Sequence, residues 1–503
     1  MSEPIRLPAL DGSTVSFEDR IIGSGQKKDC YLSSDGQYVV LWYREVLSEL
    51  ELSRLQEIVG RYRQQLLSGV AAGYWSELMC WPDRIVRYQD RIGITAPRYG
   101  NGFFFEHGSK DGDTLKLRGK EKEGYWFASL RHRARTLDAR ELGDWRAALR
   151  MALRISRSLR RLHAAGLVHG DLSYKNVLLD PPRGNACLID LDGLVVPGKY
   201  PPDVIGTPDF IAPEVVATRH LQRTDANRKL PSWHTDLHAL AVLNYLLLLL
   251  RHPLRGDQIH DLDDDERQES LQMGQQALFV EDPLRPENRI QPQLLETYEH
   301  PWKLTAQLPY RILGSELAPL VERAFVEGLH DPGQRPTAQE WEDALVRTAD
   351  TLHPCSNSSC PAGWFVFDAQ RFACPFCGTR VTTPVHVAHG FQRRGEANFV
   401  PTGRVRVLHH HAAIHAWHLR SDVVPNELTS PQQAARLGYV ALEGSQAYLV
   451  NEAIDDLQLL PQRKRISAGE PVVLERGQQW LVSGTEPAHL WWIDRVEPGQ
   501  SHP

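Results

Sequence analysis

The sequence predicts an α+β chain of several domains: a large mixed domain, a small cysteine-bounded knuckle and a small all-β domain. Strand-like segments followed by helical ones fill the chain as far as Leu352. Four of the seven cysteines then fall between residues 355 and 377, and short strand-like runs separated by Gly, Pro and Asn follow from residue 384. At 503 residues the chain is too long for one hydrophobic core, so we expect roughly two to four domains.

Composition narrows the classes of function. A hydrophobic content of 42% and a net charge of -6 suit a globular protein that binds neither nucleic acid nor membrane. The first eleven residues are polar, contain two prolines and lack the pattern of a secretory signal. The most apolar run, residues 237–250, is too short to span a bilayer, so we expect a buried core helix. These features predict a cytoplasmic protein.

The large domain begins with strands and continues with helices. Residues 15–45 predict strands, with a hairpin turn at the Asp-Gly pair within residues 33–37. Apolar residues at helical spacing predict helices over residues 45–67 and 144–165, with strand character between them at residues 84–105. The acidic, proline-interrupted residues 259–310 predict an insertion or long loops.

The strongest motif is His-Gly-Asp-Leu-Ser-Tyr-Lys-Asn at residues 169–176, between a helix and an apolar strand. Phosphoryl transfer needs a carboxylate beside the attacking hydroxyl, and oxygen ligands for a metal that neutralises the phosphates. Asp171 and Asn176 lie five apart on one tight loop and can point into one site. Asp190 follows two apolar strand residues and suits a further metal ligand.

A third segment, Gly-Thr-Pro-Asp-Phe-Ile-Ala-Pro-Glu at residues 206–214, completes an ordered set that resembles the protein kinase family over roughly residues 15–348. The resemblance implies a two-lobed fold, with an N-lobe at residues 1–100 and a C-lobe at residues 101–348. It implies ATP and Mg²⁺ (or Mn²⁺) between the lobes. It makes Asp171 the catalytic base and Asn176 and Asp190 the metal ligands.

Two further residues carry structural roles in this resemblance. Asp236 looks like the family's buried helix aspartate that braces the catalytic loop. Arg335 looks like the partner of Glu214. Both assignments predict contacts that hold the site rather than contacts with substrate.

The N-terminal part departs from the family pattern. Residues 22–31 resemble the Gly-rich loop that covers the phosphates, but only Gly23 and Gly25 of its three glycines remain. We expect Ala96 and Arg98 to contact the nucleotide as well. By register, Leu41 stands where the family has its phosphate-binding lysine, and leucine cannot bind a phosphate.

Two interpretations of this departure remain open. In one, the domain is a pseudokinase scaffold that binds partner proteins without catalysis. In the other, Lys28 supplies the charge, because its Gly-x-Gly-x-x-Lys-x-x-Tyr pattern is similar to that of the with-no-lysine kinases. Arg44 is a second choice for that charge. Among the candidates for the glutamate that pairs with the lysine, Glu57 is preferred over those at positions 49 and 51.

The segment between Gly193 and Gly206 contains no Ser or Thr, and only Tyr200 carries a hydroxyl. Gly170 replaces the arginine that grips a phosphorylated residue of this segment in the family. Activity is therefore predicted not to need phosphorylation by a Ser/Thr kinase. The His-Gly-Asp triplet also occurs in small-molecule kinases of the aminoglycoside type, which remain an alternative. The Gly-Thr and Ala-Pro-Glu elements favour a protein Ser/Thr substrate, whereas Ser173 in place of the usual lysine counts against that Ser/Thr preference.

Cysteine spacing predicts a zinc knuckle at residues 353–380. Cys355 and Cys360 form one pair, and Cys374 and Cys377 form the other, with Gly378 in the turn. Four thiolates at such spacing suit tetrahedral Zn²⁺, and a closed site of this kind is structural. The remaining cysteines are expected to be small buried hydrophobes.

Residues 384–503 predict a β-sandwich-like interaction domain whose clustered histidines are structural. The whole arrangement resembles bacterial kinases associated with tellurium-resistance-type operons, which combine a His-Gly-Asp kinase with a Cys-rich knuckle. That resemblance implies a von Willebrand A-type protein and a metal-dependent phosphatase as partners, beside the protein substrate.

Overall fold

The computed structural model describes residues 3–202, 204–222, 224–299, 302–395, 398–444, 446–484 and 487–498. Contacts divide the chain into two compact units. The first unit comprises Met1–Gly143, Ala147–Pro309 and Pro319–Glu342, and the second comprises Asp144–Arg146, Tyr310–Ala318 and Asp343–Pro503.

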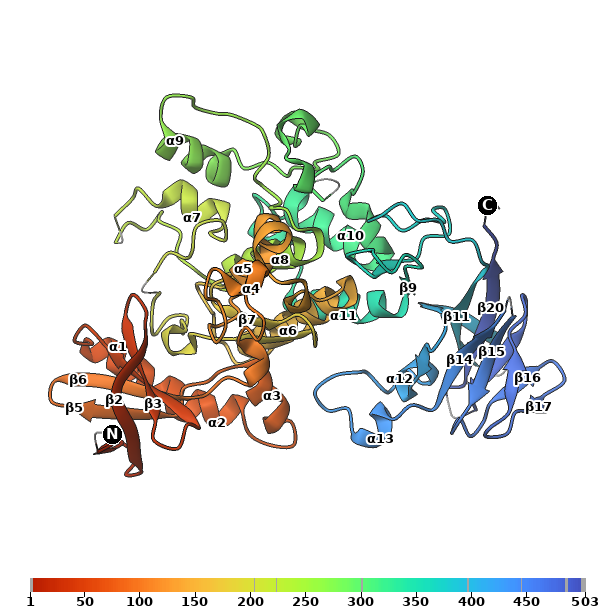
Figure 1. The fold of residues 1–503 in the computed structure, drawn as a ribbon, viewed down its shortest axis with the longest axis horizontal. Helices are drawn as coiled ribbons and strands as arrows, with labels where there is room; N and C mark the ends of the chain where they lie inside the picture. Colours follow the sequence, from red (N-terminus) through yellow and green to blue (C-terminus); the bar gives the residue numbers. More distant parts are fainter. Residues whose placement is uncertain are drawn as a thin grey trace. The chain divides into compact units, whose positions relative to one another are not determined.

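The first unit begins with a six-stranded antiparallel sheet in the order β1-β2-β3-β4-β6-β5 (Figure 1). The predicted hairpin joins β3 to β4. Successive side chains of β4 point to opposite faces of the sheet, and each face has its own apolar cluster. Val40 and Trp42 pack on one face, whereas Leu41 and Tyr43 pack on the other. The strands are β1 Ile5–Pro8, β2 Thr14–Ser24, β3 Lys28–Ser33, β4 Tyr38–Tyr43, β5 Arg84–Tyr88 and β6 Arg91–Pro97.

Helix α1 (Glu49–Glu57) covers the face of the sheet that carries Tyr43. It starts with a capping box in which Ser48 and Glu51 satisfy each other's backbone N–H groups. The helix continues through a π-helical turn (Ile58–Tyr62) into α2 (Arg63–Leu66), which confirms the helix predicted over residues 45–67. Helix α3 (Ala72–Leu78) follows.

The helical part of the chain surrounds α8 (Trp233–Leu249), which is buried from Thr235 to its end and is the predicted core helix. Helix α6 (Trp145–Ala164) leads to a hairpin of β7 (Val177–Asp180) and β8 (Asn185–Leu188). The other helices are α4 Lys110–Asp113, α5 Gly124–Ala128, α7 Pro213–Thr218, α9 Asp265–Ser270, α10 Gly314–Glu322 and α11 Ala338–Asp350.

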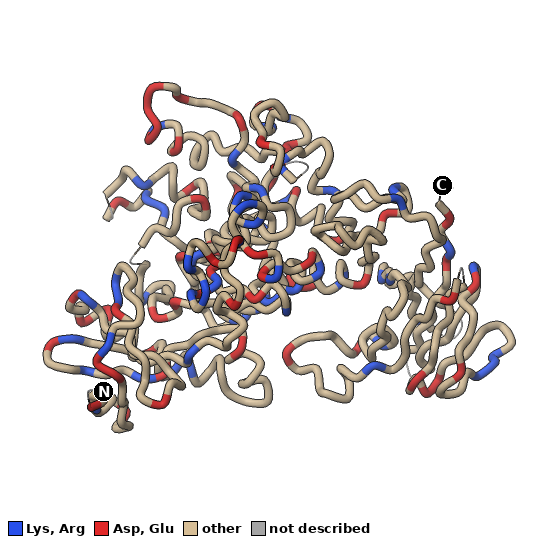
Figure 2. Tube along the Cα trace, in the orientation of Figure 1, with Lys and Arg blue, Asp and Glu red and all other residues tan. Residues whose placement is uncertain are grey.

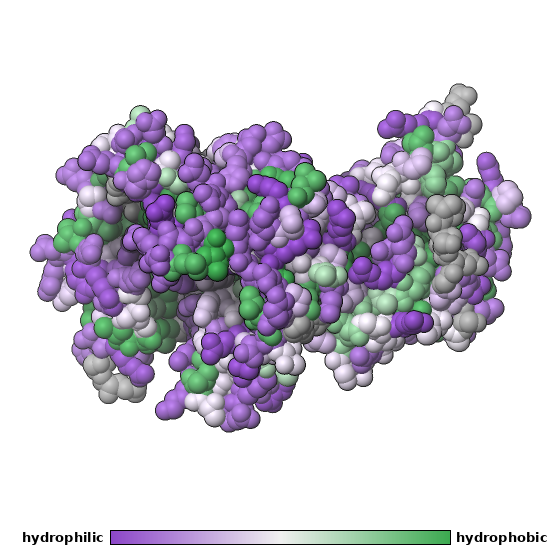
Figure 3. Space-filling view, turned by 90° about the horizontal axis from the view of Figure 1, so that it is seen from above, coloured by the Kyte–Doolittle hydropathy of each residue, from purple (hydrophilic) through white to green (hydrophobic). Residues whose placement is uncertain are grey.

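The acidic segment predicted as an insertion consists of α9, a π-helical turn (Leu271–Gln275), short 3-10 turns and loops. Figure 2 shows some of its aspartates and glutamates on the loop that leads into α9. The surface seen in Figure 3 is mostly hydrophilic, with apolar residues in small groups. Within the described ranges, no helix has both the length and the apolarity that crossing a membrane requires.

The second unit contains the cysteine cluster and two sheets. Strand β9 (Leu352–Pro354) pairs with β10 (Trp364–Val366) beside the cysteines. One sheet has the order β12-β11-β20-β19-β16-β17 and the other β13-β14-β15-β18. Short helices α12 (Ala416–Leu419) and α13 (Pro431–Ala434) lie between strands in the chain. The strands are β11 Val385–Arg394, β12 Asn398–Val407, β13 Ala413–Ile414, β14 Gly438–Glu443, β15 Gln446–Asn451, β16 Gln458–Leu460, β17 Lys464–Arg465, β18 Pro471–Val473, β19 Gln479–Ser483 and β20 His489–Val496.

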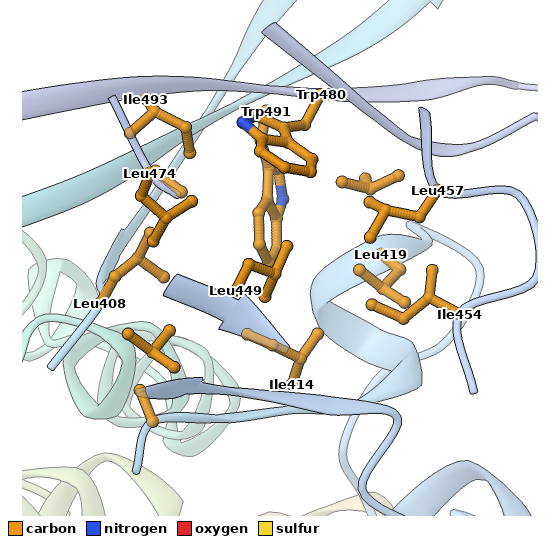
Figure 4. Packing of buried hydrophobic residues seen from close by; sticks show 14 of the residues in the cluster. Leu408, Ile414, Leu419, Leu449, Ile454, Leu457, Leu474, Trp480, Trp491 and Ile493 are labelled. Carbon is orange, nitrogen blue, oxygen red and sulfur yellow. The ribbon is translucent and has the colours of Figure 1, made fainter. Parts of the chain in front are cut away.

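The two sheets share one apolar core. Trp480 and Trp491, from the larger sheet, pack against Leu449 and Ile414 from the smaller one (Figure 4). Burial of two tryptophans contributes a large apolar area to a small domain. This packing confirms the small all-β domain predicted from the sequence.

Candidate active site

The loop between α6 and β7 is held by one buried carboxylate. Asp236 of α8 is 1% exposed and accepts hydrogen bonds from the backbone N–H groups of His169 (2.7 Å) and Gly170 (2.9 Å). The Oδ2 atom of Asp236 also lies 3.0 Å from His163 Nε2. Hydrogen bonds to a charged acceptor are stronger than neutral ones. The contacts confirm the bracing role expected for Asp236.

The loop brings Asp171 and Asn176 together, as their spacing predicted. Asn176 Nδ2 donates to the carbonyl oxygen of Asp171 at 2.7 Å and to its Oδ2 at 3.2 Å. The other carboxylate oxygen of Asp171 accepts a hydrogen bond from Thr207 Oγ1 at 2.8 Å. The Asp171 carboxylate is therefore held between the loop at residues 169–176 and the segment at residues 206–214.

These side chains line a cavity of about 490 Å³, a size typical of small-molecule sites. The cavity gathers five predicted site residues, which are Gly25, Lys28, Asp171, Asn176 and Asp190. Three others are not among its lining residues. Gly23 lies in β2 and pairs with Cys30, Ala96 lies in β6 and pairs with Val39, and the backbone N–H of Arg98 donates to Gln37.

The ammonium of Lys28 joins β3 to the segment that follows β8. Its Nζ lies 2.7 Å from Asp190 Oδ1 and 2.7 and 2.8 Å from the two carboxylate oxygens of Asp192. Burial alone would lower the pKa of Lys28, but the charges of Asp192 and Asp190 raise it above its ordinary value. Lys28 is therefore a cation within the site.

The strand residue at this cluster is Tyr43. Lys28 pairs directly with Tyr43 across the β3–β4 ladder, and the Tyr43 hydroxyl contacts the Asp192 carboxylate. Leu41, two residues earlier, packs with the apolar cluster under α1.

The predicted pairing of Lys28 with Glu57 is also wrong. Glu57 contacts the ammonium of Lys199 instead. Arg44, the second choice for the phosphate-binding charge, forms an ion pair with Asp29 at 2.8 Å. Neither residue lines the cavity that holds Asp171.

Sequence reasoning missed Asp192 and Tyr43. Asp192 is buried beside Lys28, whereas Asp190 is half exposed. The sequence did contain a signal for Asp192, because Asp-Leu-Asp-Gly at residues 190–193 places a second carboxylate directly before the glycine. The backbone of Asp190 adopts the left-handed conformation, with φ 61° and ψ 42°, at this turn.

Residues 199–201 pack against α1. Tyr200 is 2% exposed, and its hydroxyl lies 2.8 Å from Ser53 Oγ. Arg54 Nη1 donates to the carbonyl oxygen of Pro201 at 3.2 Å. The one hydroxyl that the segment offers for phosphorylation is therefore enclosed by the protein.

The segment at residues 206–214 ends in a buried ion pair. The two Nη atoms of Arg335 each lie 2.8 Å from an oxygen of Glu214. The Arg335 side chain is 1% exposed, and it also donates to backbone carbonyl groups. This geometry confirms the predicted pair.

The four knuckle cysteines converge in space. Their sulfur atoms all lie within 4.8 Å of one another, with Cys355 and Cys377 at 3.5 Å and Cys360 and Cys374 at 3.8 Å. Tetrahedral zinc with Zn–S bonds of about 2.3 Å requires sulfur atoms about 3.8 Å apart. Gly378 has φ +73° and closes the turn by donating its N–H to the Cys374 carbonyl. The donor set therefore fits zinc.

The tail histidines make other contacts. His418 Nε2 lies 3.1 Å from Asp350, and His410 Nδ1 accepts a hydrogen bond from the Leu442 N–H at 3.0 Å. The ring of His415 stacks on Trp417 with centroids 4.4 Å apart. These are structural contacts within the second unit.

Removal of the bracing carboxylate gives a direct test of the loop geometry. Asp236→Ala leaves the N–H groups of His169 and Gly170 without their acceptor, at a cost of about 1–3 kcal/mol for each buried group. We expect amide hydrogen exchange at these two positions to accelerate on the order of tenfold or more. Asp236→Asn, which keeps an acceptor oxygen, should lie between the wild type and Asp236→Ala. Unchanged exchange in Asp236→Ala would contradict the bracing role.

Residues 128–343 match the family model described as the protein kinase domain. Curated relatives include death-associated protein kinase dapk-1 of Caenorhabditis elegans, 35% identical over 123 residues, or 24% of this chain and 8% of that protein. Serine/threonine-protein kinase H1 of Homo sapiens is 33% identical over 118 residues, or 22% of this chain and 26% of that protein. The matched segments thus span about a quarter or less of these relatives.

Calcium-dependent protein kinase 11 of Arabidopsis thaliana is 33% identical over 107 residues, or 20% of this chain and 19% of that protein. The solved Toxoplasma gondii rhoptry antigen kinase domain aligns with 17% identity and a TM-score of 0.35 over 54% of this chain and 78% of that one. By its family match and architecture, the chain has an α+β protein kinase fold followed by a four-cysteine cluster and β-rich sheets.

Proposed function

We propose that the chain is a Ser/Thr protein kinase that transfers the γ-phosphate of ATP to a protein hydroxyl. The observation that carries this proposal is one cavity lined by Lys28, Asp171, Asn176 and Asp190. It supplies a base, a cation and two oxygen-bearing metal ligands to the same space. Phosphoryl transfer depends chiefly on positioning and on charge stabilisation, and this set provides both.

Asp171 is the proposed base. Its carboxylate is fixed by Asn176 and Thr207, so it can accept the proton of a substrate hydroxyl without first reorienting. Asp190 and Asn176 are the proposed ligands of Mg²⁺ or Mn²⁺. The Asp190 side chain is 52% exposed and can therefore be reached from the cavity. When bound, the ion neutralises charge on the phosphates.

Lys28 is the proposed phosphate-binding cation in place of the missing strand lysine. It pairs with Tyr43 on the neighbouring strand, two residues beyond Leu41, and it lines the same cavity as Asp171, so its ammonium can serve the phosphates there. A buried ammonium is costly unless it is paired, and Asp190 and Asp192 provide the pairing. The site thus retains a cation at the phosphates despite its altered strand.

A Ser/Thr protein substrate is supported by two observations. The relatives include proteins named as serine/threonine-protein kinase H1 and calcium-dependent protein kinases. Thr207 and Glu214 belong to a segment anchored at both ends, at Asp171 and at Arg335.

We further propose lobes at residues 1–100 and 101–348, a knuckle at residues 353–380 and an interaction domain at residues 384–503. The von Willebrand A-type and phosphatase partners rest on the family resemblance alone.

One observation favours the pseudokinase alternative. Lys28 is engaged by two carboxylates, so the fold has a structural use for this lysine even without nucleotide. A scaffold that binds partner proteins without catalysis would keep such a cluster. Transfer measurements separate the two functions.

Phosphate transfer from labelled ATP, with magnesium or manganese, to the chain itself and to generic protein substrates tests the proposal. Asp171→Asn should lower kcat by about 10²–10⁴-fold, because it removes the base. Lys28→Ala should lower the rate by about 10²-fold or more, because it removes a preorganised cation. Lys120→Ala, at an exposed lysine away from the cavity, is the matched control and should transfer normally.

The outcomes discriminate among the interpretations. Loss in Asp171→Asn alone would retain the kinase and contradict the role of Lys28. A wild type that binds nucleotide and transfers nothing would contradict the enzyme and favour the scaffold. A normal rate in Asp171→Asn would contradict the assigned base.

We also propose a structural zinc ion held by the four knuckle cysteines. Metal analysis of the purified chain should find one zinc per molecule, and Cys374→Ser should lower the zinc content and the melting temperature. Cys187→Ser, at a buried thiol in β8 outside the cluster, is the control and should retain zinc. A wild type free of zinc after purification without chelators would contradict the assignment.

A further inference from the structure

We propose that Asp192 is the positioning residue that holds Lys28 toward the phosphates, in the place where protein kinases use a glutamate of the N-lobe helix. This inference rests on the proposed function, because it assigns Lys28 its task at the nucleotide. It differs from the metal-binding role given to Asp190. The two aspartates divide the contacts to Lys28 unequally.

Both carboxylate oxygens of Asp192 contact Lys28 Nζ, at 2.7 and 2.8 Å, whereas Asp190 contributes only Oδ1 at 2.7 Å. The side chain of Asp192 is 7% exposed and that of Asp190 is 52% exposed. A half-exposed carboxylate with one oxygen on the lysine can exchange that contact for a metal ion. A buried carboxylate with both oxygens on the lysine is suited to hold it.

The glutamates of α1 are engaged elsewhere or exposed. Glu57 pairs with Lys199, and Glu51 accepts hydrogen bonds from the Ser48 backbone and hydroxyl at 2.8 and 2.7 Å. The side chain at position 49 is exposed. Helix α1 contributes both Glu51 and Arg54 to a second cavity, of about 140 Å³, that Lys28 and Asp192 also line. Glu51 caps the start of its own helix through Ser48, whereas both oxygens of Asp192 contact Lys28.

Tyr43 fixes the orientation of Asp192. The phenol is buried, and its hydroxyl contacts Asp192 from the strand residue that pairs with Lys28. Burial and the charge of Asp192 raise the pKa of Tyr43 well above its ordinary value, so the hydroxyl stays protonated and donates. Sheet, tyrosine and aspartate together define where the ammonium lies.

These contacts predict a sequence of exchanges at the site. An ammonium has three N–H donors, so Lys28 can keep Asp192 while it exchanges the Asp190 contact for a phosphate oxygen. Asp190 is then released to a metal ion. Asp192 would act on nucleotide binding only through Lys28, which distinguishes a positioning residue from a metal ligand.

A double-mutant cycle tests this distinction, with calorimetric binding of ATP in magnesium as the readout. Asp192→Asn and Lys28→Ala should each weaken binding about tenfold or more, and the double variant should bind no more weakly than Lys28→Ala alone. Asp192→Glu should partly restore binding. Glu57→Gln is the matched control and should bind within about twofold of the wild type.

Several outcomes would overturn the proposal. Additive losses in the double variant, together with a tenfold higher magnesium requirement in Asp192→Asn, would make Asp192 a metal ligand. Unchanged binding in Asp192→Asn, or a loss as large in Glu57→Gln, would return the role to the helix. Because the readout is binding, a wild type that binds ATP but transfers no phosphate overturns the proposed function and leaves this inference standing.

Discussion

The ammonium of Lys28, shared between two carboxylates, joins the antiparallel sheet to the segment after β8. An ammonium taken out of water costs several kcal/mol, and a carboxylate costs as much, so neither could be buried here alone. Removal of Lys28 would leave Asp190 and Asp192 facing each other without their counter-charge. The same interaction that holds the two segments together therefore supplies the cation that we assign to the phosphates.

Two other carboxylates, the buried Asp236 and the partly buried Glu214, complete the frame around this cluster. Asp236 accepts hydrogen bonds from the backbone of the loop at residues 169–176 and so fixes that loop. Glu214 fixes the segment at residues 206–214 through its ion pair with Arg335. Asp171 lies between these anchors and contacts both Asn176 and Thr207. Three acid-centred contacts, each linking segments distant in sequence, thus place the proposed base, a cation and two candidate metal ligands around one cavity.

The sequence was sufficient to predict those helices and site residues that depend on local pattern and on order along the chain. Spacing was enough for Asp171 and Asn176 because both lie on one short loop, and for the knuckle cysteines because two close pairs must converge to share a metal. Periodicity sufficed for α1 and α6, whose apolar faces are continuous, and the uninterrupted apolar run at residues 237–250 predicted α8. The pairing of Lys28 was not predictable in this way, since it depends on strand register and on the turn at Asp190. Leu41 and Tyr43 point to the same face, so alternation alone could not choose between them.

An ATP analogue with an acyl group on its terminal phosphate tests whether Lys28 serves the phosphates, because the analogue acylates the amine that lies beside that phosphate. After reaction in magnesium and digestion, peptide mass spectrometry identifies the modified lysine. We expect acylation of Lys28 that unmodified ATP prevents. Acylation confined to other lysines, with Lys28 unmodified, would show that the ammonium of Lys28 does not serve the phosphates.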